Sequence, residues 1–397
     1  MVSFATSHGQ KQIVIIGGGV IGCCAAYYLS THPDYDPVQH TISVVEASSI
    51  AGGSSGKAAG CLCEWADPQC LGPASFKLHA DLAAKHSGEK AWGYRRVHGA
   101  ADCDFVQKHL DDPDADTSIP NHLDWVDRSK FKWYKPLGNT AQVHPHQFTT
   151  NMAKLAKERD ACFVEATVLS INYDHFKGNQ EVKSVTIRRK QSGETLDLPA
   201  SDVVIAAGPW TKTLLPDAPV GGEKSHSIVV KPPRSISSTI LFFDPGHLDD
   251  DKKNQLEIYP RPDDTVYLSG QTDYGLKISS SSDDVHPDPR RCKELMNNVG
   301  IVSPLLHKSK VTVQQACFRP IVNVRDRDPE LGPLLEFTGI KGLILAAGHN
   351  QWGIQNAPIT GKVVSELIFQ GMSHSADIRE LDPKPHLKGV DATSGAR

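Results

Sequence analysis

Three glycines near the N-terminus have the spacing of a loop that binds a dinucleotide. Gly17, Gly19 and Gly22 follow the pattern G-x-G-x-x-G directly after residues 12–16, which are expected to form a buried strand. The first glycine permits a tight turn, the second lets a pyrophosphate approach the backbone, and the third lets the next helix pack closely. The phosphates would lie at a helix N-terminus, where free N–H groups favour negative charge. Glu46 follows about two dozen residues later, near the usual position of a carboxylate that binds a ribose hydroxyl. The alternative is an ordinary strand–helix turn followed by a surface glutamate.

A second segment of small residues follows this unit. Residues 51–60 are all Gly, Ala or Ser except for Lys57. Such a segment can lie flat against a planar ring or surround phosphate oxygens, because few side chains shield its backbone donors. A flexible linker is the alternative, but a linker would not usually follow so closely on a ribose-binding strand.

The elements that would hold these residues have an α/β pattern. Fully apolar runs predict strands that are buried on both faces of a parallel sheet. Such runs are 202–210 and 342–349, and further strands are expected at 12–16, 41–45 and 161–170, with a hairpin at 180–198. Helices are expected at 20–29, 75–91, 147–159 and 361–369, and residues 350–360 are expected to form a loop.

Residues 226–320 have a different pattern. Short β-type runs alternate with turn residues, which is typical of an antiparallel sheet, and one helix is expected at 289–299. We therefore predict an α/β protein with a discontinuous Rossmann-type nucleotide domain and an α+β substrate domain built on an antiparallel sheet. The nucleotide domain would comprise residues 1–95, 146–222 and 320–397, and the substrate domain residues 96–145 and 223–319.

Composition excludes several classes of function. The chain has 397 residues, which suits two domains, and a formal net charge of −4, which gives no indication of nucleic-acid binding. No apolar run is long enough to span a membrane. His144 and His146 lack a third ligand nearby, and the acidic segment 111–116 is expected to be a solvated loop, so no metal site is predicted. Nine scattered cysteines and the absence of a secretion signal favour reduced thiols and a cytoplasmic location.

Four blocks together resemble the D-amino-acid-oxidase-like flavoprotein family, which includes glycine oxidase and sarcosine oxidase. The blocks are residues 15–22, 53–60, 203–210 and 348–361. Within that family, Ser55–Ala58 and His226–Ile228 resemble a fungal branch. The first and third blocks occur in many flavoproteins, whereas all four in this order are specific.

The resemblance implies that the cofactor is FAD and not NAD. The first βαβ unit would hold the adenosine half, and the segments 54–60 and 348–354 would reach the isoalloxazine ring. Val168 would contact adenine through its backbone. The residues expected to bind FAD are Gly17, Gly19, Val20, Ile21, Gly22, Glu46, Ala47, Gly53, Ser54, Ser55, Lys57, Ala58, Ala59, Gly60, Val168, Ala207, Gly208, Trp210, Gly348, His349, Gln351, Gly353 and Ile354.

The resemblance also implies oxidation of a C–N bond in a small amine or amino acid, with hydride transfer to flavin N5 and O₂ as the expected acceptor. The flavin carries the difficult chemistry, so the protein must mainly orient the substrate and tune the ring. Arg319 stands where relatives carry the arginine that binds the substrate carboxylate, a task that suits a planar guanidinium. A structural arginine in a salt bridge is the alternative.

Three further residues are candidates for catalysis. Lys57 could stabilise a reduced, anionic ring and help it react with O₂; a solvated lysine or a phosphate contact is the alternative. His226 and Tyr259 lie on the predicted sheet and could hydrogen-bond the substrate, or could equally serve the core or the sheet edge. Cys61 and Cys63 raise the question of covalent flavin attachment, but buried free thiols are expected.

Departures from the family leave other functions open. Gln351 stands where glycine-oxidase-like members often carry an arginine, and segment 111–120 has no obvious counterpart. A bulkier or secondary amine therefore remains possible as substrate. The alternatives are a flavin dehydrogenase that acts on a hydroxy acid with another acceptor, and a non-catalytic FAD-binding redox or interaction module. A protein that binds only nicotinamide would leave segments 53–60 and 348–361 without a purpose.

Overall fold

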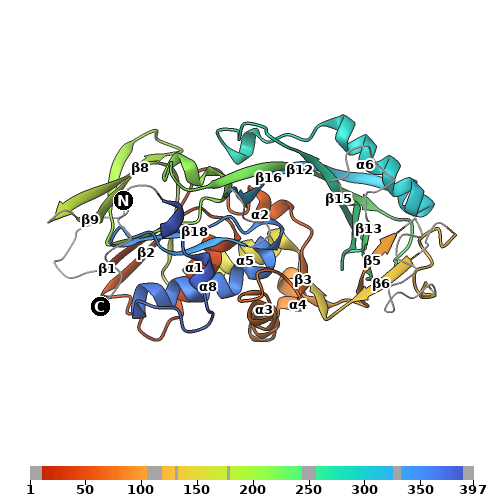
Figure 1. Cartoon of the computed structure of the whole chain (residues 1–397), viewed down its shortest axis with the longest axis horizontal. Coiled ribbons are helices and arrows are strands. Elements are labelled where there is room, and N and C mark those ends of the chain that lie inside the picture. Colours follow the sequence, from red (N-terminus) through yellow and green to blue (C-terminus); the bar gives the residue numbers. More distant parts are fainter. Residues whose placement is uncertain are drawn as a thin grey trace.

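A computed structural model describes residues 11–104, 119–129, 133–176, 179–243, 256–324 and 332–387. The acidic segment 111–116 lies outside these residues. The described chain forms two large sheets and one small one, and the long strands β12 and β16 run from one large sheet to the other (Figure 1). No helix among the described residues is long and apolar enough to cross a membrane.

The first large sheet has eight strands in the order β10-β9-β8-β2-β1-β11-β18-β17. Its five central strands are parallel, as predicted, and the outer three are antiparallel to their neighbours. The strands are β1 (Lys11–Ile16), β2 (His40–Glu46), β8 (Cys162–Phe176), β9 (Asn179–Arg189), β10 (Thr195–Pro199), β11 (Asp202–Ile205), β17 (Leu334–Phe337) and β18 (Leu343–Ala347).

Helices cover one face of this sheet (Figure 1). They are α1 (Val20–Ser30), α3 (Gly72–His86), α4 (Gly88–Trp92), α5 (Pro145–Lys157) and α8 (Gly353–Gln370). The small residues of α1 allow close packing on two sides. A Cβ atom at Gly22 would lie 2.0 Å from the carbonyl oxygen of Gly17, and one at Gly361 would lie 2.6 Å from the carbonyl carbon of Cys24.

The second large sheet has seven strands in the order β16-β12-β15-β14-β13-β5-β6. All its pairings are antiparallel except that of β13 with β5. Helices α6 (Pro289–Val302) and α7 (Pro304–His307) pack on one face of it. The strands are β5 (Ala100–Asp104), β6 (Trp133–Leu137), β12 (Val220–Lys231), β13 (Ile240–Phe243), β14 (Leu256–Pro260), β15 (Val266–Asp273) and β16 (Lys310–Val322). The predicted fold class is confirmed.

Short elements connect the two sheets. The small sheet consists of β3 (Cys61–Cys63), β4 (Arg95–Arg96) and β7 (Thr140–Gln142), and α2 (Ser54–Lys57) precedes it. The 3₁₀ turns are η1 (Gly208–Thr213), η2 (Ser282–Asp284), η3 (Asn350–Trp352), η4 (Arg379–Leu381) and η5 (Lys384–His386). β12 and β16 each cross a predicted domain boundary, and β7 joins the sheet of β3, so the exact domain limits stay a prediction.

Two predicted elements differ from the structure. The helix expected at 75–91 is two helices, because Ser87 adopts a left-handed conformation with φ of 55°. The loop expected at 350–360 is wrong, since α8 already begins at Gly353 and contains Pro358. Pro358 lacks the N–H that would bond to the Ile354 carbonyl, and Nε2 of His79 donates to that oxygen instead, at 2.9 Å. Tertiary packing thus offsets the low helix propensity of this segment.

Candidate active site

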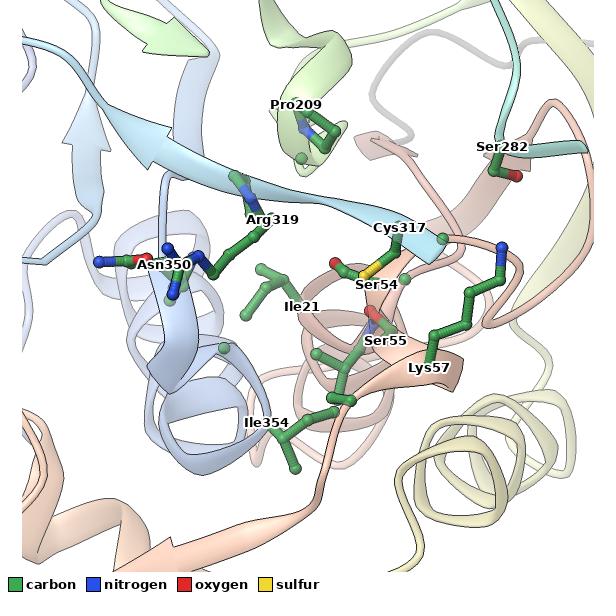
Figure 2. A pocket seen from close by; sticks show the side chains of 18 of the residues that line it. Ile21, Ser54, Ser55, Lys57, Pro209, Ser282, Cys317, Arg319, Asn350 and Ile354 are labelled. Atoms are coloured by element: carbon green, nitrogen blue, oxygen red, sulfur yellow. Dashed lines mark hydrogen bonds between the residues drawn. The ribbon is translucent and has the colours of Figure 1, made fainter. Parts of the chain in front are cut away.

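A cavity of about 1160 Å³ lies where the two large sheets meet, and Figure 2 shows part of its lining. Of the predicted FAD-binding residues, all except Gly22 line this cavity. Among the predicted catalytic residues, Arg319, Lys57 and Tyr259 line it and His226 does not. The structure therefore brings together residues that are up to about 340 positions apart in the chain.

The turn between β1 and α1 forms one end of the cavity. Gly17 has a φ of +116°, and a Cβ there would lie 2.4 Å from the Ala206 carbonyl oxygen, so only glycine fits. Gly19 caps α1 without a side-chain hydrogen bond. The next N–H group, that of Val20, donates to Ser55 Oγ at 2.9 Å. A helix N-terminus and a hydroxyl group thus meet at the position predicted for the phosphates.

Glu46 is held rigidly at the end of β2. One carboxylate oxygen accepts from the N–H of Gly18 at 2.6 Å, and the other accepts from the N–H and the Oγ of Ser48, both at 2.8 Å. Ser48 Oγ also lies 2.6 Å from Ser282 Oγ, which belongs to η2, between β15 and α6. Glu46 thus lies at the cavity, where a carboxylate that binds a ribose is expected, and its contact with a ribose stays a prediction.

The loop from Gly348 and the start of α8 form another wall. His349 is fully buried, and its Nε2 lies 3.0 Å from Thr360 Oγ1. Burial lowers the pKa of His349 to about 3, so this ring is neutral near pH 7 and serves to hold the loop onto α8. Gly353 and Ile354 then present the first turn of α8 to the cavity.

These residues fit FAD. A Cβ at Gly208 would meet nothing within 4 Å, and one at Gly53 would only touch Trp210, at 3.7 Å, so both positions leave room for a flat ring. Backbone donors lie at two helix N-termini, those of α1 and α8. The cavity is also larger than the roughly 300–1,000 Å³ of ordinary small-molecule pockets, as a dinucleotide with a substrate requires. Among the described residues no cluster of side chains could hold a metal ion.

Lys57 points toward β16. Its Nζ donates to the Ala316 carbonyl oxygen at 3.0 Å, which fixes the ammonium group beside Cys317 (Figure 2). Burial raises the pKa of the Cys317 thiol to about 11, although the charges of Lys57 and Arg319 oppose this shift. Cys61 reaches the cavity and Cys63 is buried, and both are free thiols.

Arg319 lies in the cavity but is already paired. Its Nη2 forms an ion pair with Glu223 Oε2 at 2.8 Å, and its Nη1 donates to Gln351 Oε1 at 3.3 Å. Glu223 stands directly opposite on β12, in the same register. The Nε of Arg319 is buried without a hydrogen-bond partner among the described residues. A substrate carboxylate would therefore compete with a carboxylate of the protein.

The structure separates Tyr259 from His226. Tyr259 Oη donates to Glu257 Oε2 at 2.7 Å inside the cavity, and burial raises the pKa of this phenol well above its usual value. His226 is not among the residues that line the cavity: its Nε2 donates to Asp273 at 2.9 Å and its Nδ1 accepts from the N–H of Asp288 at 3.2 Å. The prediction that His226 contacts the substrate is therefore wrong, because hydrogen bonds to Asp273 and to the N-cap residue of α6, Asp288, hold its ring outside the cavity lining.

Several lining residues were missed from the sequence. They are Trp65, Asp102, Glu223, Phe242 and Glu257. Glu257 could have been found, because it shares one face of a strand with Tyr259. The other four depend on strand pairings and loop positions that no local pattern shows.

The chain is similar to known proteins over nearly its whole length. The family model DAO, described as FAD dependent oxidoreductase, matches residues 12–367. TDA3 of Saccharomyces cerevisiae, which is named as an oxidoreductase, is 30% identical over 98% of this chain and 96% of its own. Glycine oxidase of Geobacillus kaustophilus is 23% identical over 90% of this chain and 93% of its own.

Solved structures share the fold. The crystal structure of Geobacillus kaustophilus glycine oxidase superposes with a TM-score of 0.73 at 19% identity, covering 95% of this chain and 100% of that one. Iminodiacetate oxidase from Chelativorans sp. BNC1 gives a TM-score of 0.72 at 18% identity, covering 94% and 98%. The chain therefore belongs to the DAO family of FAD-dependent oxidoreductases, and it is an enzyme with FAD as its cofactor.

Proposed function

We propose that this enzyme oxidises a C–N bond of an amine or amino acid, with O₂ as the electron acceptor. The observation that carries the proposal is the single cavity in which the predicted flavin-binding loops face the polar and aromatic side of the antiparallel sheet. Glycine oxidase and iminodiacetate oxidase, which share the fold, are both named for compounds with a C–N bond.

The residues of this chain would bind and orient the reactants. When FAD is bound, it accepts the hydride equivalent from the substrate carbon. Where the substrate carries a carboxylate, Arg319 would hold it, in exchange for its contacts with Glu223 and Gln351. Lys57, fixed by the Ala316 carbonyl oxygen, would keep a positive charge near the cofactor and favour its reaction with O₂. Burial raises the pKa of Tyr259, so its hydroxyl group remains protonated and would orient the Glu257 carboxylate by donating a hydrogen bond to it.

An anaerobic visible spectrum tests this proposal. The purified holoenzyme is titrated with amino acids, N-methyl amines and hydroxy acids, and the flavin band is followed. We expect bleaching by an amine or amino acid, and peroxide formation when air is admitted. Bleaching by hydroxy acids alone would support the dehydrogenase alternative instead. A flavin band that no compound in the panel bleaches would favour a non-catalytic module. A cytoplasmic location stays a prediction from the sequence, which cell fractionation tests.

A further inference from the structure

The charged side chains that line the cavity fall into two groups, one beside β16 and one toward the other edge of the seven-stranded sheet. The two lining cations on the β16 side are Lys57, which donates to Ala316, and Arg319, whose charge is balanced by Glu223. Glu257 on β14 and Asp102 on β5 line the other side. On the β16 side an anionic substrate group therefore meets Lys57 and an arginine that already has a carboxylate partner, whereas on the other side a cationic group meets two carboxylates.

Asp102 and Glu257 belong to one row across three strands. Phe242 on β13 pairs with Asp102 on one side and with Glu257 on the other. Residues paired in this way share a face of the sheet, so the two carboxylates flank the Phe242 ring, with backbones about 10 Å apart. Lys135 stands opposite Asp102 on β6, and its charge partly opposes the rise in the Asp102 pKa that burial causes.

The carboxylate of Glu257 is held by two hydroxyl groups of the cavity wall. Tyr259 Oη and Ser269 Oγ donate to the same oxygen, Oε2, at 2.7 and 2.9 Å. Both donors are neutral hydroxyl groups, and among the described residues Glu257 has no ion pair with a cation. Two hydrogen bonds thus orient the carboxylate without neutralising it.

An aromatic wall connects this row to the loop before α8. Trp352 and Trp65 have ring centroids 5.7 Å apart, Trp65 and Phe242 are 6.5 Å apart, and Phe242 and Tyr259 are 5.8 Å apart. Each pair is edge-to-face, with interplanar angles between 82° and 89°. Aromatic surfaces beside carboxylates bind amines and alkylated ammonium groups through cation–π attraction and charge.

We propose that the substrate carries a second, positively charged nitrogen, which Glu257 and Asp102 bind against Phe242. The substrate class is then a diamine or a longer, polyamine-like amine, in which one nitrogen is oxidised and the other is recognised. The two nitrogens must differ in protonation. The nitrogen to be oxidised must be neutral, because the adjacent carbon gives up hydride only when the nitrogen lone pair is free, and the recognised nitrogen must be protonated. This inference rests on the proposed amine oxidation, and it makes Glu257 the residue that selects substrate charge.

Three N-methyl amines of matched length test the selection: N-methyl-1,4-diaminobutane, N-methylpentylamine and 5-(methylamino)pentanoate. Their far ends are cationic, neutral and anionic. We expect kcat/KM for the diamine to exceed that for the neutral amine by about 10- to 100-fold, the factor of a charge-assisted hydrogen bond. Glu257→Gln keeps an oxygen acceptor for Tyr259 and Ser269 but removes the charge, so it should abolish this preference. Glu294→Gln, on the exposed side of α6, is the matched control and should retain it.

Binding without turnover separates this inference from the proposed function. Butyltrimethylammonium has no nitrogen lone pair and therefore cannot give up hydride from the adjacent carbon. It should perturb the flavin spectrum of the wild type and of Glu294→Gln but not of Glu257→Gln. If the diamines fail to reduce the flavin yet this cation binds in a Glu257-dependent manner, the cationic site stands and amine oxidation fails. If an amine is oxidised with a neutral or anionic preference, the inference is overturned while the proposed function stands. If neither a preference for the diamine nor Glu257-dependent binding of butyltrimethylammonium is observed, the inference is overturned as well.

Discussion

Substitution of Gly22 by alanine tests the physical basis of cofactor binding. The added Cβ would lie 2.0 Å from the Gly17 carbonyl oxygen, whereas ordinary contacts begin at 3.4 Å. Helix α1 and the turn must therefore move apart by more than about 1 Å, and an overpacked site of this kind costs about 1–3 kcal/mol. The same movement displaces the N-terminal N–H groups of α1 from the phosphate position. We expect the dissociation constant for FAD to rise by about 5- to 150-fold.

Fluorescence titration of the apoprotein with FAD measures this effect directly. Gly99→Ala is the matched control, because a Cβ at Gly99 meets nothing within 4 Å. Thermal unfolding of the apoproteins shows whether Gly22→Ala still folds, and Ser55→Ala, which removes the acceptor of the Val20 N–H, provides a milder change at the same place. If FAD affinity of a folded Gly22→Ala protein stays within about twofold of the wild type, close packing at this turn does not control cofactor binding.

Four further predictions concern the site and the core. Arg319→Leu should raise KM for a carboxylate-bearing substrate by at least about 10-fold, the loss expected for a charge-assisted hydrogen bond, and unchanged kinetics would remove Arg319 from substrate binding. Lys57→Met should slow reoxidation by O₂ in stopped-flow experiments while flavin reduction is retained; normal reoxidation would contradict the proposed role of the ammonium group. Burial lowers the pKa of His79 to about 4, below the ordinary 6.5, so neutral His79 stabilises the fold above pH 6.5 and this contribution, about 3 kcal/mol at most, is lost as the pH falls through 4. His79→Gln should flatten the fall in the free energy of unfolding between pH 6.5 and 4, and an identical slope would exclude His79 as its source. Acid precipitation should release the flavin, because Cys61 and Cys63 are expected to remain free thiols; flavin retained in the pellet and lost in a Cys61→Ser variant would show attachment.

Local patterns in the sequence were sufficient for the nucleotide-binding half. The apolar run before Gly17, the glycine spacing and Glu46 predicted a parallel sheet and a helix N-terminus, and the structure has both. Such features depend on residues close together in the chain, where backbone conformation and steric limits act directly. The antiparallel pattern of residues 226–320 likewise predicted the seven-stranded sheet. Strands β12 and β16 extend beyond the short runs 227–230 and 311–318 that the sequence indicated.

Long-range packing decided what the local patterns could not. The sequence favoured a loop before residue 361 because Gly and Pro are poor helix formers, but His79, from a distant helix, supplies the hydrogen bond that Pro358 removes. His226 and Tyr259 were equivalent candidates, and only the sheet and its covering helix α6 separate them.

The sequence by itself determined a dinucleotide-binding site and the general architecture, because the glycines and strand patterns that bind a dinucleotide act within a few residues of one another. The resemblance of four blocks to a known family then indicated FAD and not NAD. The tertiary structure alone decided which charged side chains line the cavity together. Arg319 could be identified from its segment, but its pairing with Glu223 follows from the register of two strands about a hundred residues apart. Asp102 and Glu257 likewise meet across Phe242 only when three separate strands are aligned. Side chains from distant segments acquire a common function through strand register, and that register depends on the whole packed sheet.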